Sequence, residues 1–259
     1  MTTALTKYDL RGVAAFITLN SPGTRNALAA GLVAELDAHL RAAHADDAVR
    51  AIVLTGAGPA FCAGADLRAR GNMGTPVAGR QNPFVGVLKL MRHGPKPVIA
   101  AVNGAAFGGG AGLVAAADIA IAAESAVFSF SEVRLGVIPA MISVVVLPKL
   151  GEHTTMRLFL TGERFAAAQA KEYGLVHAVV PDEELEKACL AEVDGIAKGG
   201  PNAIREAKRL VRTVACLPED EAYAYAEERI AALFASEEAA EGIAAFTEKR
   251  PARWVPKKA

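Results

Sequence analysis

The chain has 259 residues, of which 52% are hydrophobic, and its 28 lysines and arginines equal its 28 aspartates and glutamates in number. This length suits one large domain, or one domain with an appendage, and the apolar content is ample for a core. The balanced charge gives no electrostatic reason to expect nucleic acid or an anionic membrane surface as the main partner.

The cysteines and the beginning of the chain bear on its compartment. Cys62, Cys189 and Cys216 are widely spaced, with no Cys-x-x-Cys pattern and no Cys/His ligand spacing. We therefore expect neither a disulfide framework nor a zinc site, and a reducing compartment. No basic patch precedes an apolar stretch at the start, and no window approaches about 18 uninterrupted apolar residues. The cytoplasm is the expected location.

The first predicted elements are a strand over residues 13–19 and an amphipathic helix that opens at residues 25–28 and runs to about residue 43. An Asn-Ser-Pro-Gly sequence ends the strand. The helix carries an apolar stripe with four-residue spacing, formed by Leu28, Leu32, Leu36 and Leu40.

A second apolar strand over residues 52–55 leads into a glycine turn and small residues that end at Asp66, a residue suited to capping a helix. Residues 68–82 are polar and rich in glycine, which predicts a mobile loop that could line a substrate mouth. A helix over residues 83–91 follows and ends at a His-Gly-Pro sequence.

The stretch 96–113 combines a strand, a glycine run and a helix start. Residues 98–102 are continuously apolar and β-branched in part, as in a strand buried on both faces. Residues 108–110 are glycines, so a ligand can approach their backbone, and the first N–H groups of the helix after them lack intrahelical partners. These donors favour developing negative charge.

A glycine run taken alone indicates tight packing of a helix on a strand equally well. The stretch 52–67, however, repeats the design of strand, glycine turn and helix start. Two such turns that face one another could supply two backbone donors to one oxygen.

The remaining pattern predicts a helix over residues 109–117 and strands over residues 118–122, 126–128 and 176–180. From about residue 143 it turns mainly helical, with helices over residues 143–150, 152–160, 166–173, 183–196, 201–214, 218–234 and 236–249. Regular alternation of short apolar strands with helices predicts an α/β fold with crossover connections.

Five collinear segments resemble the enoyl-CoA hydratase/isomerase (crotonase) superfamily, namely residues 61–67, 96–110, 118–122, 131–139 and 160–165. The resemblance implies a crotonase-type spiral of ββα units over residues 1–200 and a C-terminal helical layer, residues 201–259, for CoA cover and oligomerisation. It also implies an acyl-CoA substrate, no cofactor besides the coenzyme A thioester of that substrate, and a homotrimer or a hexamer built as a dimer of trimers.

In that family the thioester carbonyl lies between two backbone N–H groups, which by position are those of Ala65 and Gly109 here. Glu132 takes the position of the family's second catalytic glutamate, and its apolar neighbours should raise its pKa toward values useful for acid/base catalysis. From the residues alone, a buried ion pair with Arg134 or a solvated carboxylate also remains open.

The chain departs from the family pattern at Gly112, where two-glutamate hydratases carry their first catalytic glutamate. Glycine cannot transfer a proton, but one carboxylate can serve both steps of hydration in sequence, and a 1,3-proton shift needs only one. Residues 139–143 also place methionine and isoleucine where many hydratases carry a glycine-rich turn. This form looks like hydratases of the 3-methylglutaconyl-CoA type that have this glycine.

The resemblance further implies a set of substrate and CoA contacts. Arg25 matches a contact to the CoA nucleotide, although a solvated turn arginine explains it equally well. Phe246 and Lys249 match residues that close over CoA, often from a neighbouring subunit, whereas a basic helix end complementing the dipole would also explain Lys249. The full predicted set is Arg25, Ala27, Ala63, Ala65, Asp66, Leu67, Gly109, Pro139, Met141, Phe246 and Lys249.

The expected function is therefore a lyase that reversibly hydrates a 2-enoyl-CoA, with Glu132 as the single acid/base. One alternative is an isomerase that converts a 3-enoyl-CoA to a 2-enoyl-CoA. Another is an acyl-CoA-binding relative that lost its activity with the first glutamate.

Overall fold

A computed structural model describes residues 4–68 and 82–256 of the chain. The loop predicted over residues 68–82 lies almost entirely outside the described residues. In the part of the chain that is described, none of the helices combines the length and the hydropathy that crossing a bilayer requires.

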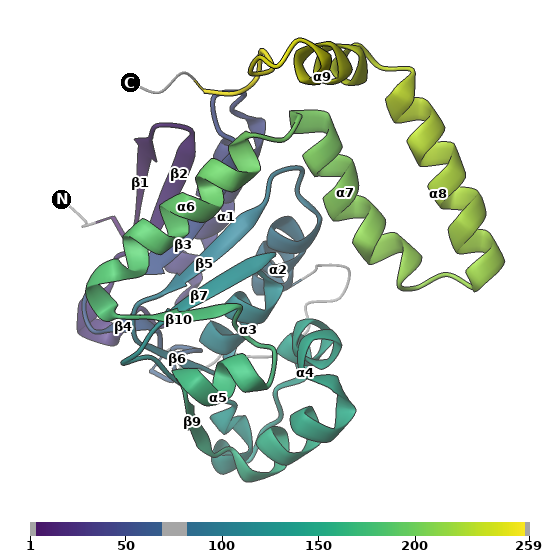
Figure 1. The fold of residues 1–259 in the computed structure, drawn as a ribbon. Coiled ribbons are helices and arrows are strands. Elements are labelled where there is room, and N and C mark those ends of the chain that lie inside the picture. Colours follow the sequence, from purple (N-terminus) through teal and green to yellow (C-terminus); the bar gives the residue numbers. More distant parts are fainter. Residues whose placement is uncertain (1–3, 69–81, 257–259) are drawn as a thin grey trace.

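Two sheets form the centre of the fold (Figure 1). The larger sheet has the order β1 (Thr6–Arg11), β2 (Ala14–Leu19), β3 (Ala51–Gly56), β5 (Val98–Val102), β7 (Ile119–Ala123) and β10 (Ala178–Val180). The smaller sheet has the order β4 (Ala60–Cys62), β6 (Ala105–Phe107), β8 (Val127–Ser129) and β9 (Arg164–Ala166). The pairs β1–β2 and β8–β9 are antiparallel, and the other strand pairs are parallel.

The chain repeats one path three times: a strand of the larger sheet, a short strand of the smaller sheet, and a helix. The three units are β3–β4–α2 (α2, Pro83–His93), β5–β6–α3 (α3, Gly109–Ala116) and β7–β8–α4 (α4, Ala140–Thr161). The predicted α/β spiral of ββα units is therefore confirmed. Before it, β1 and β2 pair in the larger sheet and lead to α1 (Ala30–Ala45).

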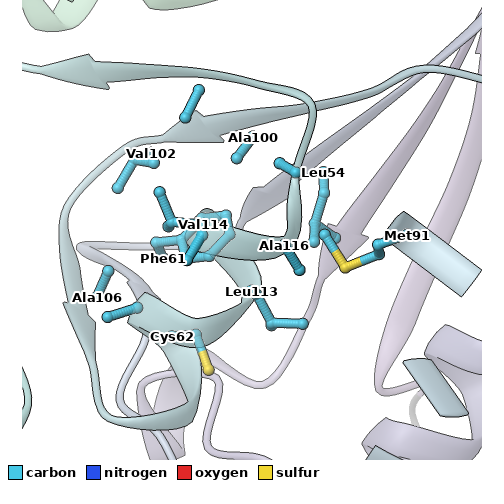
Figure 2. Close-up of a cluster of buried hydrophobic side chains, with 14 of the residues drawn as sticks. Leu54, Phe61, Cys62, Met91, Ala100, Val102, Ala106, Leu113, Val114 and Ala116 are labelled. Carbon is cyan, nitrogen blue, oxygen red and sulfur yellow. The ribbon is translucent and has the colours of Figure 1, made fainter. Parts of the chain in front are cut away.

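Apolar layers cover both faces of the larger sheet, because successive side chains of a strand point to opposite faces. On β3, Ile52 and Leu54 join a cluster with side chains of α1, α2 and α3, in which Figure 2 shows Leu54, Met91 and Leu113. Val53 belongs to a second cluster that includes Leu185, Cys189 and Val193 of α6 (Leu185–Ala197). Every residue of β5 is buried, as its continuous apolar sequence predicts.

The last three helices leave the sheets and form an arm: α7 (Pro201–Val214), α8 (Glu219–Phe234) and α9 (Glu237–Thr247) (Figure 1). Every residue of α7 and α8, taken as a whole, is at least partly exposed. Large apolar side chains are exposed along this arm, namely Val211, Tyr223, Ile230, Phe234, Ile243 and Phe246. The arm therefore offers apolar surface that its own chain does not cover.

The prediction for the first helix was wrong at its start. The first helix begins at Ala30 and not at residues 25–28, because Arg25 and Asn26 both adopt the left-handed backbone conformation, with φ of 55° and 57°. The helices predicted over residues 143–150 and 152–160 are the two parts of α4, on either side of the non-helical Gly151, and the first part begins earlier, at Ala140. The short helix α5 (Ala167–Glu172) follows β9 and completes the fold.

Asp118, at the start of β7, fastens the arm to the larger sheet. Its Oδ2 accepts a hydrogen bond from the N–H of Val98 at 2.8 Å and pairs with Lys208 Nζ at 2.8 Å, while its Oδ1 pairs with Arg212. The Lys208 side chain is only 7% exposed, and its ammonium also donates to the carbonyls of Met91 and Lys96. Burial lowers the pKa of Lys208, so its charge depends on this carboxylate.

We expect Asp118→Ala to lower the free energy of unfolding by about 3–5 kcal/mol, because it leaves a buried ammonium without its counter-ion. Urea unfolding followed by circular dichroism measures this loss. The matched control is Asp37→Ala, which removes the exposed ion pair with Arg41 and should cost less than about 1 kcal/mol. Equal, small losses in both variants would show that Lys208 is not buried against Asp118 in solution.

Candidate active site

The site lies where three neighbouring strands of the smaller sheet end. Because β4, β6 and β8 run parallel, the residues that follow them emerge at one edge. These segments are residues 63–65, 108–109 and 130–132. The N–H of Gly108 donates to the carbonyl of Ser129 at 2.8 Å, which ties the second segment to the third.

The first two segments touch through their backbones. Gly64 has a φ of 87°, and a Cβ at this position would lie 2.7 Å from the carbonyl oxygen of Phe107 and 3.4 Å from the nitrogen of Gly109. Any larger residue would push the turn after β4 away from the start of α3. Glycine at position 64 therefore brings Ala65 next to Gly109.

Two amide groups at this junction are free to bind a ligand. Gly109 is the first residue of α3, so its N–H has no intrahelical partner. Within the described residues, the N–H groups of Ala65 and Gly109 donate to no other backbone group. Ala65 is exposed and Gly109 is partly exposed. An oxygen with negative charge could therefore reach both donors.

Asn26, which is not among the predicted site residues, holds the first turn in place. Its fully buried side chain donates from Nδ2 to the carbonyls of Ala57, Ala60 and Phe61 at 3.0, 2.8 and 3.2 Å. Its Oδ1 accepts from the N–H of Ser21 at 2.8 Å. The only signal in the sequence was an asparagine at a turn, a residue that tolerates a positive φ better than most.

The neighbouring backbone also pairs with this turn. The N–H of Leu28 donates to the carbonyl of Gly64 at 2.8 Å, and the N–H of Ala63 donates to the carbonyl of Arg25 at 2.9 Å. Residues 25–28, which were predicted to open the first helix, thus support the turn that carries Ala65.

Glu132 lies on a 3-10 turn (Ser131–Leu135) and turns its carboxyl toward Gly108. A Cβ on Gly108 would lie 2.9 Å from Oε1 and 3.6 Å from Oε2. Oε2 is buried and has no hydrogen-bond partner in the described part of the chain. Burial raises the pKa of Glu132 above its ordinary value of 4.5. The carboxyl is thus held beside the start of α3, in an environment that favours its protonated form.

The two alternative interpretations of Glu132 are not supported. Arg134 donates from Nε and Nη2 to the carbonyl of Thr161, each at 3.3 Å, and forms no ion pair with Glu132. A solvated carboxylate would not have a fully buried oxygen atom.

The space beside Gly112 is filled by an apolar side chain. A Cβ at this position would lie 2.9 Å from the Cβ of Ile142 and closer still to its Cγ2. Ile142 is 3% exposed. Ile142 of α4 therefore occupies the space that a side chain at position 112 would need.

Most of the predicted contact residues lie on the segments that meet at this site. Asp66 accepts from the N–H of Arg68 at 3.0 Å, as in a turn, and Leu67 is 55% exposed. The others differ in exposure: Ala27 and Pro139 are buried, Ala63 is partly buried, and Arg25 and Met141 are exposed.

Phe246 and Lys249 lie elsewhere. Phe246 is 87% exposed on α9, and Lys249 follows that helix. In Figure 1, α9 is at the opposite end of the molecule from α4 and β6. The chain does not close these two residues over its own Glu132, so their contact with CoA stays a prediction about a neighbouring subunit.

The cysteine and metal chemistry of the region is limited. Cys62 is buried, and burial raises the pKa of its thiol to about 12, so it is not a thiolate nucleophile near neutral pH. Among the described residues, no group of His, Cys, Asp and Glu side chains is arranged to hold a metal ion.

Known proteins are similar to this sequence along most of its length. A protein of Rhizobium meliloti (strain 1021) named "Probable enoyl-CoA hydratase" is 40% identical over 247 residues, which cover 95% of this chain and 96% of that protein. "Enoyl-CoA hydratase EchA19" of Mycobacterium tuberculosis (strain ATCC 25618 / H37Rv) is 36% identical and covers 93% of each chain.

The fold agrees as well. A crystal structure of an enoyl-CoA hydratase from Shewanella pealeana ATCC 700345 superposes with a TM-score of 0.90 at 32% identity and covers 96% of each chain. The sequence model of the family described as enoyl-CoA hydratase/isomerase matches residues 11–257. With this match over nearly the whole sequence, the chain belongs to the enoyl-CoA hydratase/isomerase family.

Proposed function

We propose that the protein reversibly hydrates a 2-enoyl-CoA, with the N–H groups of Ala65 and Gly109 as an oxyanion hole and Glu132 as the single acid/base. The observation that carries this proposal is the buried, unpartnered carboxyl oxygen of Glu132 beside the glycine turn. Such a group is costly to bury, and a proton transfer to or from a substrate explains its place. The names of the relatives agree with this activity.

The two amides would act on the thioester oxygen. When water attacks the β carbon, the electrons of the C=C bond move toward the thioester and give an enolate. Donors that are already fixed at the oxygen stabilise its charge without reorganising, and one such donor is worth roughly 2.7–4 kcal/mol of the barrier. Ala65 and Gly109 are held by backbone packing at Gly64, which provides this rigidity.

Glu132 would move the proton. Its carboxylate accepts a proton from the attacking water as the C–O bond forms at the β carbon. It then returns a proton to the α carbon while the enolate collapses to the thioester, so the carboxylate is regenerated. Dehydration runs these steps in reverse. The raised pKa suits a group that must both accept and donate.

Gly112 favours a one-acid reaction and leaves a second candidate activity. The apolar contact between Gly112 and Ile142 is compatible with 3-methylglutaconyl-CoA hydratase-like members, which the resemblance describes as having this glycine. It is equally compatible with a 1,3-proton shift that converts a 3-enoyl-CoA to a 2-enoyl-CoA. An inactive acyl-CoA-binding relative is less well supported, because such a protein has no need to keep an unpaired carboxyl in the site.

We also propose a homotrimer or a hexamer in the cytoplasm. The exposed apolar side chains of α7, α8 and α9 form surface that a neighbouring subunit could cover. The three cysteines are free, and Cys62 and Cys189 are buried, which fits a reducing compartment.

We expect wild-type protein to remove the thioester-conjugated double bond of crotonyl-CoA, measured as loss of ultraviolet absorbance. Glu132→Gln should lower this rate by about 10²–10⁴, because the amide cannot carry the proton. The control is Glu124→Gln, which changes an exposed glutamate in the turn after β7 and should keep the wild-type rate.

If Glu132→Gln lowers the hydration rate by no more than a factor of about two, Glu132 is not the acid/base. If the wild type instead converts a 3-enoyl-CoA to its 2-enoyl isomer and adds no water to crotonyl-CoA, the isomerase is the correct activity.

The pKa of Glu132 also predicts how stability depends on pH. A carboxyl with a raised pKa in the folded state contributes stability that is present below its unfolded pKa and is lost as the pH rises through the folded value. Glu132→Gln cannot ionise, so we expect its stability relative to wild type to be higher at about pH 7 than at about pH 4. Urea unfolding at both pH values measures the difference. The same relative stability at both would show that this carboxyl is not desolvated.

A further inference from the structure

One face of α3 receives two side chains from the same neighbouring segment. Gly108 and Gly112 are one helical turn apart, and the N–H of Gly112 donates to the carbonyl of Gly108 at 3.0 Å. The carboxyl of Glu132 lies over the first glycine, and the side chain of Ile142 lies over the second. Residues 132–142 therefore meet α3 at two points.

The chain between these points is held by short backbone bonds, by the buried Pro139 and by the contact of Arg134 with the carbonyl of Thr161. Leu135, Val137 and Ile138 are 54, 57 and 73% exposed, so their side chains do not anchor the segment in the core. Short backbone bonds make the segment compact, including one from the N–H of Val137 to the carbonyl of Glu132 at 3.2 Å. A shift of Ile142 would therefore be passed to Glu132.

Glycine at position 112 allows the second contact. Its absent Cβ leaves the space in which Ile142 packs, since an alanine there would lie only 2.9 Å from the isoleucine Cβ. Gly110 differs, because its missing Cβ faces the backbone of Cys62, which cannot be shortened by mutation. At Gly112 the neighbouring atoms belong to the side chain of Ile142, so the contact can be altered by mutating either residue.

We propose that Ile142, packed on Gly112, is a positioning residue that sets where the carboxyl of Glu132 lies on α3. This inference rests on the proposed role of Glu132 in the reaction. Under this proposal the contact between Gly112 and Ile142 is required by the active site. Gly112 is then a packing residue, and not only a position that lacks a second acid.

The test is a double-mutant cycle between Gly112→Ala and Ile142→Ala. We expect Gly112→Ala to lower kcat by about 10² with little change in KM, because a displacement of about 1 Å of a catalytic group has this effect. Adding Ile142→Ala to Gly112→Ala should recover at least about tenfold of the loss, since it removes the obstructing Cγ atoms. Ile142→Val, which keeps both Cγ positions on the Cβ, should stay within about threefold of wild type.

The matched control is Gly86→Ala in α2, where a Cβ would meet its nearest neighbour, Asp37 Oδ1, at an ordinary 3.8 Å. It should leave kcat unchanged. Additive effects of Gly112→Ala and Ile142→Ala, or a wild-type kcat in Gly112→Ala, would overturn the proposal. If Gly112→Ala does not fold, Ile142→Ala and Ile142→Val are compared without it. The proposal expects a loss of kcat in Ile142→Ala only, so a loss in both variants or in neither contradicts the proposal.

A second readout separates this proposal from the proposed function. The pKa of Glu132 can be followed by the ¹³C shift of its carboxyl, assigned by comparison with Glu132→Gln. We expect the raised pKa to move toward 4.5 in Gly112→Ala and to rise again in the double variant. An unchanged pKa in Gly112→Ala would overturn the positioning role. Absence of turnover in the wild type would overturn the proposed function alone, because this titration needs no substrate.

Discussion

The site depends on the contact between two glycine turns. Gly64 presents its backbone to the carbonyl of Phe107 and the nitrogen of Gly109 at distances that no side chain would allow. Close approach of two backbones is the condition for two amides from distant parts of the sequence to face one oxygen. Asn26 supports this contact, because its buried side-chain amide donates to three carbonyls of the segment that leads to the first turn.

The ββα path explains why the functional groups arrive together. Each unit places its first strand in the larger sheet, where burial on both faces gives a rigid base, and its second strand in the smaller sheet. Parallel pairing of the second strands brings their ends to a common edge. The first unit thus supplies Ala65, the second Gly109 and the third Glu132. One repeated topology therefore brings two backbone N–H donors and a buried carboxyl together on a stable scaffold.

Much of this could be predicted from the sequence, where the signal was local. The apolar run of β5 and the helix α7 were predicted at their observed bounds, since burial and helical periodicity are properties of neighbouring residues. The glycine turns and the burial of Glu132 were predicted for the same reason. The three-residue strands β4, β6 and β9 were not, because they are too short to show alternation and exist through pairing with distant strands.

Contacts between distant residues gave no signal. Asn26 adopts a left-handed conformation because its side chain is bound by a loop more than thirty residues away. The side chain that fills the space beside Gly112 comes from Ile142, which the sequence alone could not place there. Helix α1 begins later than predicted, and the space beside Gly112 is filled by an apolar side chain, for the same physical reason: tertiary packing overrides what the local pattern allows.

The most direct test of the account is the carbonyl stretching frequency of a bound thioester. Butanoyl-CoA labelled with ¹³C at the thioester carbonyl can be compared free and bound by difference infrared spectroscopy. If the Ala65 and Gly109 amides both donate to its oxygen, the band should move to clearly lower frequency than in water. A band at the same or a higher frequency in the bound state would contradict the polarisation on which the proposed chemistry depends.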